Sequence, residues 1–105
     1  MNRILMIALL LTAFAVAAPV QAGGDAARGA ELAVDCADCH GADGMGDEDN
    51  PKLAGLDEAY QIEQLKAFKS GERVDEEEMM SMYAKDLSDQ DMADLAAYYA
   101  SLGDQ

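Results

Sequence analysis

The sequence predicts a small all-α domain, and three observations support this prediction. Three stretches repeat apolar residues at helical steps of three and four. No stretch shows the strict alternation of apolar and polar residues that a half-buried strand requires. The segments between the predicted helices are long, and the first of them is rich in Gly and Asp, residues that favour turns. No internal repeat is visible, so a single domain is expected.

The first predicted helix covers about residues 25 to 36. Asp25 can cap its N-terminus. Leu32, Ala33 and Cys36 fall on one side of it, with Gly29 one turn earlier.

The second predicted helix covers about residues 57 to 70, and Gly71 follows it, as is common at helix C-termini. Its apolar side is formed by Tyr60, Ile62, Leu65 and Phe68. The third begins at Ser88, which forms a capping box with Asp91, and ends at Gly103. Its apolar repeat is Met92, Leu95, Ala96, Tyr99 and Leu102.

Two long segments separate these helices. Residues 41–55 are rich in Gly and Asp and contain Pro51, and residues 72–87 contain an acidic run, Asp75 to Glu78, and three methionines. Loops of this length in so small a domain usually have a function.

Residues 1–22 are predicted to be a cleaved secretory signal peptide. Arg3 precedes an apolar run, and small residues follow at Val20 and Ala22, the positions that a signal peptidase inspects. The alternative, a membrane anchor, is disfavoured because the run is shorter than the roughly 20 apolar residues that span a bilayer. No twin-arginine pair is present, so the Sec route is expected. It would deliver residues 23–105 to the periplasm without stable membrane insertion.

The charge is strongly acidic, with 21 acidic and 7 basic residues and a net charge of −14. Loss of Arg3 with the signal peptide would leave 21 acidic and 6 basic residues, a net charge of −15. Nucleic acid and anionic membranes are therefore poor partners, and a basic protein surface is a suitable one. Solubility, or adaptation to a salty habitat, explains the charge equally well. The chain has no Trp, and a large bound cofactor would supply the missing core.

Cys36, Cys39 and His40 form the pattern C-x-x-C-H, which is the attachment signature of haem c. Two residues between the cysteines let both sulfurs reach the two vinyl groups of one haem, and His40 then faces the iron. A thioredoxin-like redox pair would require a βαβ setting, which is not seen. A zinc site would need ligands beyond the single His and two Cys. A disulfide across so short a loop would stabilise little.

The second axial ligand of the iron is constrained by the histidine count. His40 is the only histidine, so two histidines from one chain are excluded. A methionine, a lysine, the N-terminal amine or an open site remain. Met79, Met80 and Met82 cluster downstream, and a thioether is a suitable ligand for haem iron, although methionine is also common core filler.

With these residues in hand, the chain resembles the small class I cytochromes c of bacterial periplasms, and in particular one half of their dihaem members. Four segments carry the resemblance, and together they span essentially the whole predicted mature chain: Cys36–Gly41, Asn50–Gly55, Gln64–Gly71 and Ser88–Leu102. The resemblance implies the class I cytochrome c fold, with three main helices and long loops around one covalent haem.

The resemblance also implies roles for single residues. The Pro51 carbonyl is expected to accept a hydrogen bond from His40, and such a bond orients the ring and raises its basicity. Aligning Ala84 and Leu87 with the family pattern places the distal iron ligand at Met80, with Met79 as the neighbour most easily confused with it. The first and last helices are expected to cross at Gly29, packed on Leu95 and Tyr98.

The function expected from this resemblance is a periplasmic one-electron carrier, a monomer and not an enzyme, that exchanges electrons with redox proteins bearing basic docking patches. Two alternatives remain open. One is a haem subunit of a larger periplasmic dehydrogenase or sulfur-oxidising complex. The other is a haem c sensor or enzyme with an open sixth site. The sequence does not identify the electron donor, the acceptor, the potential or the pathway.

Overall fold

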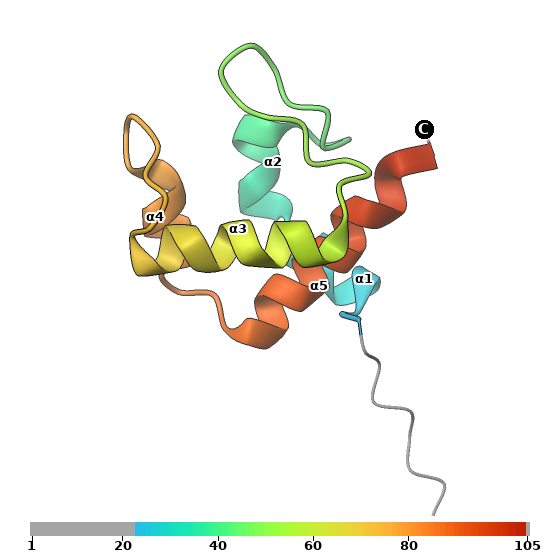
Figure 1. The fold of residues 1–105 in the computed structure, drawn as a ribbon. Helices are drawn as coiled ribbons and strands as arrows, with labels where there is room; N and C mark the ends of the chain where they lie inside the picture. The colour runs from blue at the N-terminus through green and yellow to red at the C-terminus, as the bar shows by residue number, and fades with distance from the viewer. Residues whose placement is uncertain (1–22, 105) are drawn as a thin grey trace, which may run out of the picture.

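The computed structural model describes residues 23–104, and that part of the chain is all-helical (Figure 1). The predicted fold class is confirmed, and no strand occurs between residues 23 and 104. No helix in this part is long and apolar enough to cross a membrane. The predicted signal peptide, residues 1–22, lies outside the described residues. The elements are α1 (Ala26–Leu32), α2 (Val34–His40), α3 (Glu58–Ser70), α4 (Met79–Ala84), α5 (Asp89–Ser101) and a 3₁₀ turn, η1 (Leu102–Asp104).

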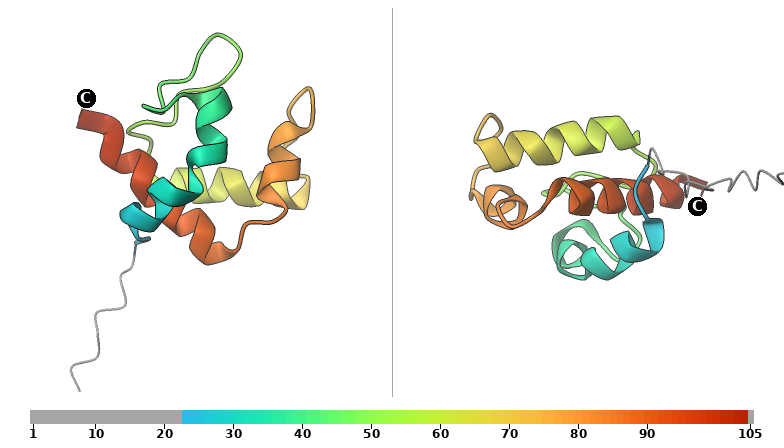
Figure 2. Two further views of the ribbon diagram at one scale, coloured as in Figure 1. Left: turned by 180° about the vertical axis from the view of Figure 1, so that it is seen from behind. Right: turned by 90° about the horizontal axis from the view of Figure 1, so that it is seen from below.

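Helix α5 lies in the middle of the fold. It packs against α1 on one side and α3 on the other, while α4 packs against α3 (Figure 2). The core cluster contains Ala33, Leu95 and Tyr99, which are all nearly fully buried. Partly buried side chains from α1, α2, α3, α5, η1 and two loops surround this cluster: Leu32, Cys36, Leu53, Leu65, Leu87, Tyr98 and Leu102. The helix that carries the cysteine motif is thus connected to the core at Ala33 and Cys36.

The predicted first helix is two helices, and this part of the prediction is corrected. The Asp25 cap is present, because its carboxylate accepts hydrogen bonds from the backbone N–H groups of Ala27 and Arg28. Helix α1 ends at Leu32, and α2 begins after the buried Ala33 and continues through His40, beyond the predicted end at Cys36. The residue at the break is an alanine and not a Gly or Pro, so the sequence contains no signal for this break.

The caps of the second and third predicted helices are confirmed. Gly71 ends α3 with a φ of 86°, in the left-handed region that glycine adopts easily. Ser88 and Asp91 form the complete capping box of α5. The apolar repeat is buried as expected from Met92 to Tyr99, whereas Leu102 is partly buried and belongs to the 3₁₀ turn η1, which continues past Gly103.

The face of α3 differs from the prediction at its first turn. Phe68 is buried, but Tyr60 is 48% exposed and Gln61 is 6% exposed. The Gln61 amide donates a hydrogen bond of 2.7 Å to the Leu56 carbonyl, which satisfies one of its polar groups away from water. The periodicity of apolar residues does not predict that a glutamine is buried. The burial of Gln61 depends instead on its hydrogen bond to the Leu56 carbonyl.

Helix α4 lies inside a segment that was predicted to be irregular. It has only six residues, which is too short for a periodic pattern, and Glu78 before it makes no side-chain cap hydrogen bond. The helix start thus lacks a capping side chain at the N-cap, and its apolar residues cover too few turns to be recognised as a repeat.

The crossing of α1 and α5 occurs at Gly29, as predicted. A Cβ atom at Gly29 would lie 2.0 Å from the Asp94 carbonyl oxygen and 2.8 Å from Tyr98 Cβ. The two backbones approach so closely that only glycine fits. The nearest backbone on α5 is that of Asp94, and Leu95 packs in the adjacent core cluster.

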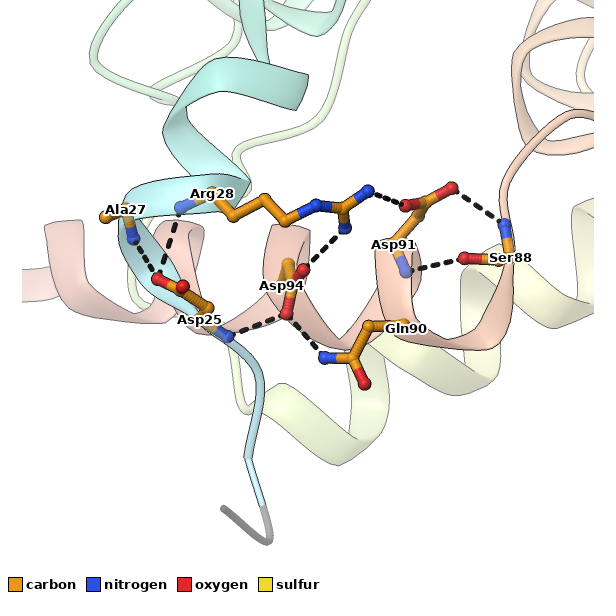
Figure 3. A network of polar contacts seen from close by, with 7 residues as sticks. All are labelled: Asp25, Ala27, Arg28, Ser88, Gln90, Asp91 and Asp94. Carbon is orange, nitrogen blue, oxygen red and sulfur yellow. Dashed lines mark hydrogen bonds and ion pairs between the residues drawn. The ribbon is translucent and has the colours of Figure 1, made fainter. Parts of the chain in front are cut away.

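A buried carboxylate joins these two helices (Figure 3). The Asp94 side chain is 1% exposed and accepts three hydrogen bonds: from the Asp25 backbone N–H at 2.7 Å, Arg28 at 2.6 Å and the Gln90 amide at 2.8 Å. Arg28 also forms an ion pair of 2.7 Å with Asp91. The Asp94 side chain of α5 thereby binds both Asp25, the N-cap of α1, and Arg28 in the first turn of α1.

The same contacts determine the charge state of Asp94. Burial by itself would raise the pKa of this carboxyl, but the hydrogen bonds from Arg28, the Asp25 amide and Gln90 outweigh it and hold the pKa below its ordinary value of 3.8. The group is therefore charged at neutral pH. Its contribution to stability is present above pH 3.8 and is lost as the pH falls through that value toward the lower folded pKa.

We predict that Asp94→Asn lowers the free energy of unfolding at neutral pH by about 1–3 kcal/mol, because an amide cannot accept all three of these hydrogen bonds. The variant should also lose part of the acid dependence of stability below pH 4, which urea titrations at several pH values would measure. The exposed Asp86 has no hydrogen bond or ion pair with a described residue, so Asp86→Asn is the matched control. Equal effects of the two substitutions would contradict the prediction.

Candidate functional site

The residues of the C-x-x-C-H pattern lie together on the short helix α2. Cys36 is half-buried on the core side, Cys39 is exposed and His40 is 5% exposed. One short helix thus presents two thiols and an imidazole whose mutual positions are set by regular backbone. The two cysteines are free and are not joined in a disulfide.

The His40 ring is oriented by a backbone carbonyl. Its Nδ1 lies 2.8 Å from the Pro51 carbonyl oxygen, which is the contact that the family resemblance implied. A carbonyl oxygen can only accept a hydrogen bond, so Nδ1 must carry the proton and donate. In the neutral ring, Nε2 then has a free lone pair, and no hydrogen bond from a described residue engages it. This tautomer is the one that a metal-binding imidazole needs.

The conformation of the loop after His40 places the Pro51 carbonyl next to the His40 ring. Gly41 has a φ of 87° and turns the chain away from α2, and the Gly46 N–H donates a hydrogen bond of 2.7 Å to the His40 carbonyl. A Cβ at Gly46 would lie 2.3 Å from the Asn50 carbonyl oxygen, so glycine is required there. The Asp47 carboxylate accepts hydrogen bonds of 2.9 Å from the backbone N–H groups of Asp49 and Asn50, the two residues that precede Pro51.

The chemistry of the cysteines disfavours two of the alternative sites. Burial raises the pKa of the Cys36 thiol, and the neighbouring Tyr99 only partly opposes this effect. Thiols that act in redox exchange are usually shifted the other way, toward the reactive thiolate. In the part of the chain that the structure describes, no three His, Cys, Asp or Glu side chains are grouped to hold a metal ion. A zinc site is therefore not supported.

Tyr99 places a polar group beside Cys36 that the sequence analysis did not identify. The side chain is 3% exposed, and its hydroxyl has no hydrogen-bond partner among residues 23–104. Burial, and secondarily the Cys36 thiol, raise the pKa of this hydroxyl, so it is a neutral donor. Buried hydroxyls without a partner are rare in proteins. The unpaired Tyr99 hydroxyl beside Cys36 is therefore consistent with a bound group whose polar atoms accept a hydrogen bond from it.

The methionines differ in their exposure. Met79 is 36% exposed and Met82 is 58% exposed, whereas Met80, the predicted ligand, is half-buried. Among Met79, Met80 and Met82, Met80 is also the one whose backbone N–H donates a hydrogen bond to a side chain, that of Asp75. Met92 of α5 is fully buried and belongs to the packed interior.

The structure brings His40 and Pro51 into contact and leaves Met80 on a separate helix. No close backbone contact joins α2 to α4 among the described residues, and both helices stand on the same side of α3 (Figure 1). The donor set of two thiols, one oriented imidazole and a thioether on a separate helix fits a covalently attached haem. The residues that would hold it are Cys36, Cys39, His40 and Met80.

Comparison with known proteins agrees with this chemistry. The family model described as Cytochrome c matches residues 26–103. Cytochrome c4 of Pseudomonas aeruginosa is 46% identical over 102 residues, which cover 96% of this chain and 49% of that protein. Cytochrome c-554(548) of Halomonas halodenitrificans is 41% identical over 80 residues, which cover 74% of this chain and 96% of that protein. The chain spans about half the length of the cytochromes c4 that it matches.

Two solved structures share the fold. The cytochrome c4 of Acidithiobacillus ferrooxidans superimposes with a TM-score of 0.68 at 35% identity, covering 72% of this chain and 49% of that one. A thiosulfate dehydrogenase, TsdBA, from Marichromatium purpuratum gives a TM-score of 0.71 at 34% identity, covering 76% of this chain and 20% of that one. The chain belongs to the cytochrome c family, as a class I member that carries covalent haem c and resembles one domain of a cytochrome c4.

Proposed function

We propose that this chain is a one-electron carrier of the periplasm, with haem c attached through Cys36 and Cys39 and ligated by His40 and Met80. The observation that carries the proposal is the fixed tautomer of His40. Its Nδ1 proton is committed to the Pro51 carbonyl at 2.8 Å, directly after the two cysteines, and its Nε2 is left free to bind a metal.

The proximal residues have distinct tasks in this proposal. Cys36 and Cys39 would supply the two thioether links that hold the group covalently. His40 supplies an imidazole nitrogen, and Pro51 keeps the ring from rotating and raises its basicity. The backbone hydrogen bonds of residues 41–55 make this geometry rigid, so little rearrangement accompanies a change in charge at the metal.

On the distal side, Met80 is the candidate ligand. Its side chain is half-buried, whereas its neighbours Met79 and Met82 are more exposed. A methionine thioether opposite a histidine favours a higher reduction potential than two histidines. If His40 and Met80 both held the metal, no small substrate would have direct access to it, which is the behaviour of a carrier rather than of an enzyme or a sensor.

The bound haem supplies a one-electron couple, and the chain supplies position and environment. The described core places Leu95, Ala33 and Tyr99 behind α2 and excludes water from that side. The acidic surface is proposed to steer the protein to basic patches on its redox partners, an attraction that salt screens. Weak and brief complexes suit such encounters. The signal-like segment at residues 1–22 supports export.

A second candidate is a haem subunit held by a larger enzyme. The observation in its favour is the match to a thiosulfate dehydrogenase, of which this chain covers 20%. Gel filtration of native periplasmic extract distinguishes the two. A free carrier elutes at the size of the isolated chain, and co-elution with a much larger protein would support the subunit instead.

For the attachment residues, we predict that Cys36→Ser combined with Cys39→Ser abolishes covalent haem. Haem staining on a denaturing gel measures this, because only a covalent link survives denaturation. The variant Cys39→Ser alone should keep a single link and stain weakly. A double variant that still stains would contradict the proposed attachment.

For the distal ligand, we predict that Met80→Ala removes the weak far-red absorption band of methionine-ligated ferric haem and lowers the reduction potential. The optical spectrum of the ferric protein measures the band, and a redox titration followed by absorbance measures the potential. Met79→Ala is the matched control and should keep the band. If Met79→Ala loses it and Met80→Ala does not, the ligand is Met79. High-spin ferrous haem that binds CO readily in the wild-type protein would contradict the carrier function itself.

A further inference from the structure

We propose that Asp75 is a positioning residue of the distal side, whose carboxylate holds the backbone of Met80 and thereby keeps the Met80 thioether at the metal. This inference rests on the proposed function, because it takes Met80 as the distal ligand. It assigns to Asp75 a role beyond its contribution to the acidic surface.

The contacts of Asp75 enclose the turn that leads into α4. The Met80 N–H is shared between the two carboxylate oxygens of Asp75, at 3.3 and 3.4 Å. The Asp75 carbonyl oxygen accepts a second hydrogen bond, of 3.0 Å, from the Glu78 N–H. Both Asp75 and Met80 are partly buried, so water competes less for these groups than at an exposed turn. One residue thus fixes the turn through its main chain and its side chain.

The backbone between these two contacts is in an unfavourable conformation. Glu78 has a φ of 56°, and it is the one non-glycine residue with a positive φ among residues 23–104. Side chains other than Asn and Asp rarely adopt this region, so the surrounding structure must hold Glu78 there. Glu78 also makes no side-chain cap for α4. Asp75, five residues before Met80, supplies the side-chain hydrogen bond that Glu78 does not make.

The other acids of the run do not share this role. Asp75, Glu76, Glu77 and Glu78 carry the same charge, but only the Asp75 side chain accepts a hydrogen bond from a described residue. If the run acted through charge alone, any of these acids would influence the haem similarly. If Asp75 acts by position, its geometry matters and its charge does not. This contrast separates the two roles experimentally.

The test uses the haem-loaded ferric chain and exogenous imidazole, which competes with the distal methionine for the iron. The Met80 bond must open before imidazole binds, so a loosened turn raises the apparent affinity. Loss of one hydrogen bond corresponds to an affinity about three- to tenfold higher. Asp75→Ala and Asp75→Glu should both show this increase and weaken the far-red methionine band. Asp75→Glu keeps the charge but moves the carboxylate by one methylene.

Two variants serve as controls for charge. Asp75→Asn removes the charge but keeps an oxygen that can accept the Met80 N–H, so it should bind imidazole as the wild type does. Glu77→Ala removes one charge from the same run and should also behave as the wild type. Circular dichroism checks that each variant keeps its helix content. Because Asp75→Glu and Asp75→Asn differ little in size from aspartate, they decide the question even if Asp75→Ala fails to fold.

The outcomes are distinguishable. Wild-type affinity in Asp75→Glu, with the band lost only in Met80→Ala, would overturn the role of Asp75 and leave the proposed ligand intact. Equal increases in Asp75→Asn, Asp75→Glu and Glu77→Ala would show a general effect of the acidic run and overturn the positional role. A wild-type protein without the methionine band would overturn Met80 ligation, and the inference with it.

Discussion

The contact between α1 and α5 determines where the rest of the molecule can lie. Gly29 lets the two backbones touch, and the buried Asp94 carboxylate bonds to Asp25 and Arg28 on the far side of that crossing. Helix α2 follows α1 after a single residue, Ala33, whose side chain is in the core. The direction of α2, and hence of its two thiols and its imidazole, is therefore set by a crossing that contains none of them. Such a buried carboxylate is tolerable because its oxygens are satisfied by hydrogen bonds, one of them charge-assisted.

The parts of the fold that the sequence predicted are those governed by local rules. The caps at Asp25 and Ser88, the apolar repeat of α5 and the glycine end of α3 each depend on residues only a few positions apart. The attachment pattern is equally local, and the family resemblance extended it to Pro51, whose carbonyl does contact His40. Other features depend on contacts with residues distant in sequence or on a rare backbone conformation, and the sequence alone does not predict these. Examples are the break at Ala33, the burial of Asp94 and Gln61, and the start of α4 after the left-handed Glu78.

The interior of this small protein is unusual in composition. Its most buried side chains include several alanines, and the chain has no tryptophan. A domain of this size buries a modest fraction of its surface and commonly depends on an additional stabilising element. Covalent haem provides such an element here, and this explains how a chain with a net charge of −14 can remain compact despite self-repulsion.

The Asp94 network also has a consequence for the order of folding. It joins residues 66 and 69 positions apart, Arg28 and Asp25 at the beginning of the domain and Asp94 near its end. Bringing such distant segments together costs loop-closure entropy before any contact repays it. During synthesis the N-terminal segment emerges first, and it cannot complete its docking until the last helix is available. Because Leu95 and Tyr99 of α5 belong to the core cluster against which Cys36 packs, this thiol stays accessible until the last helix is in place.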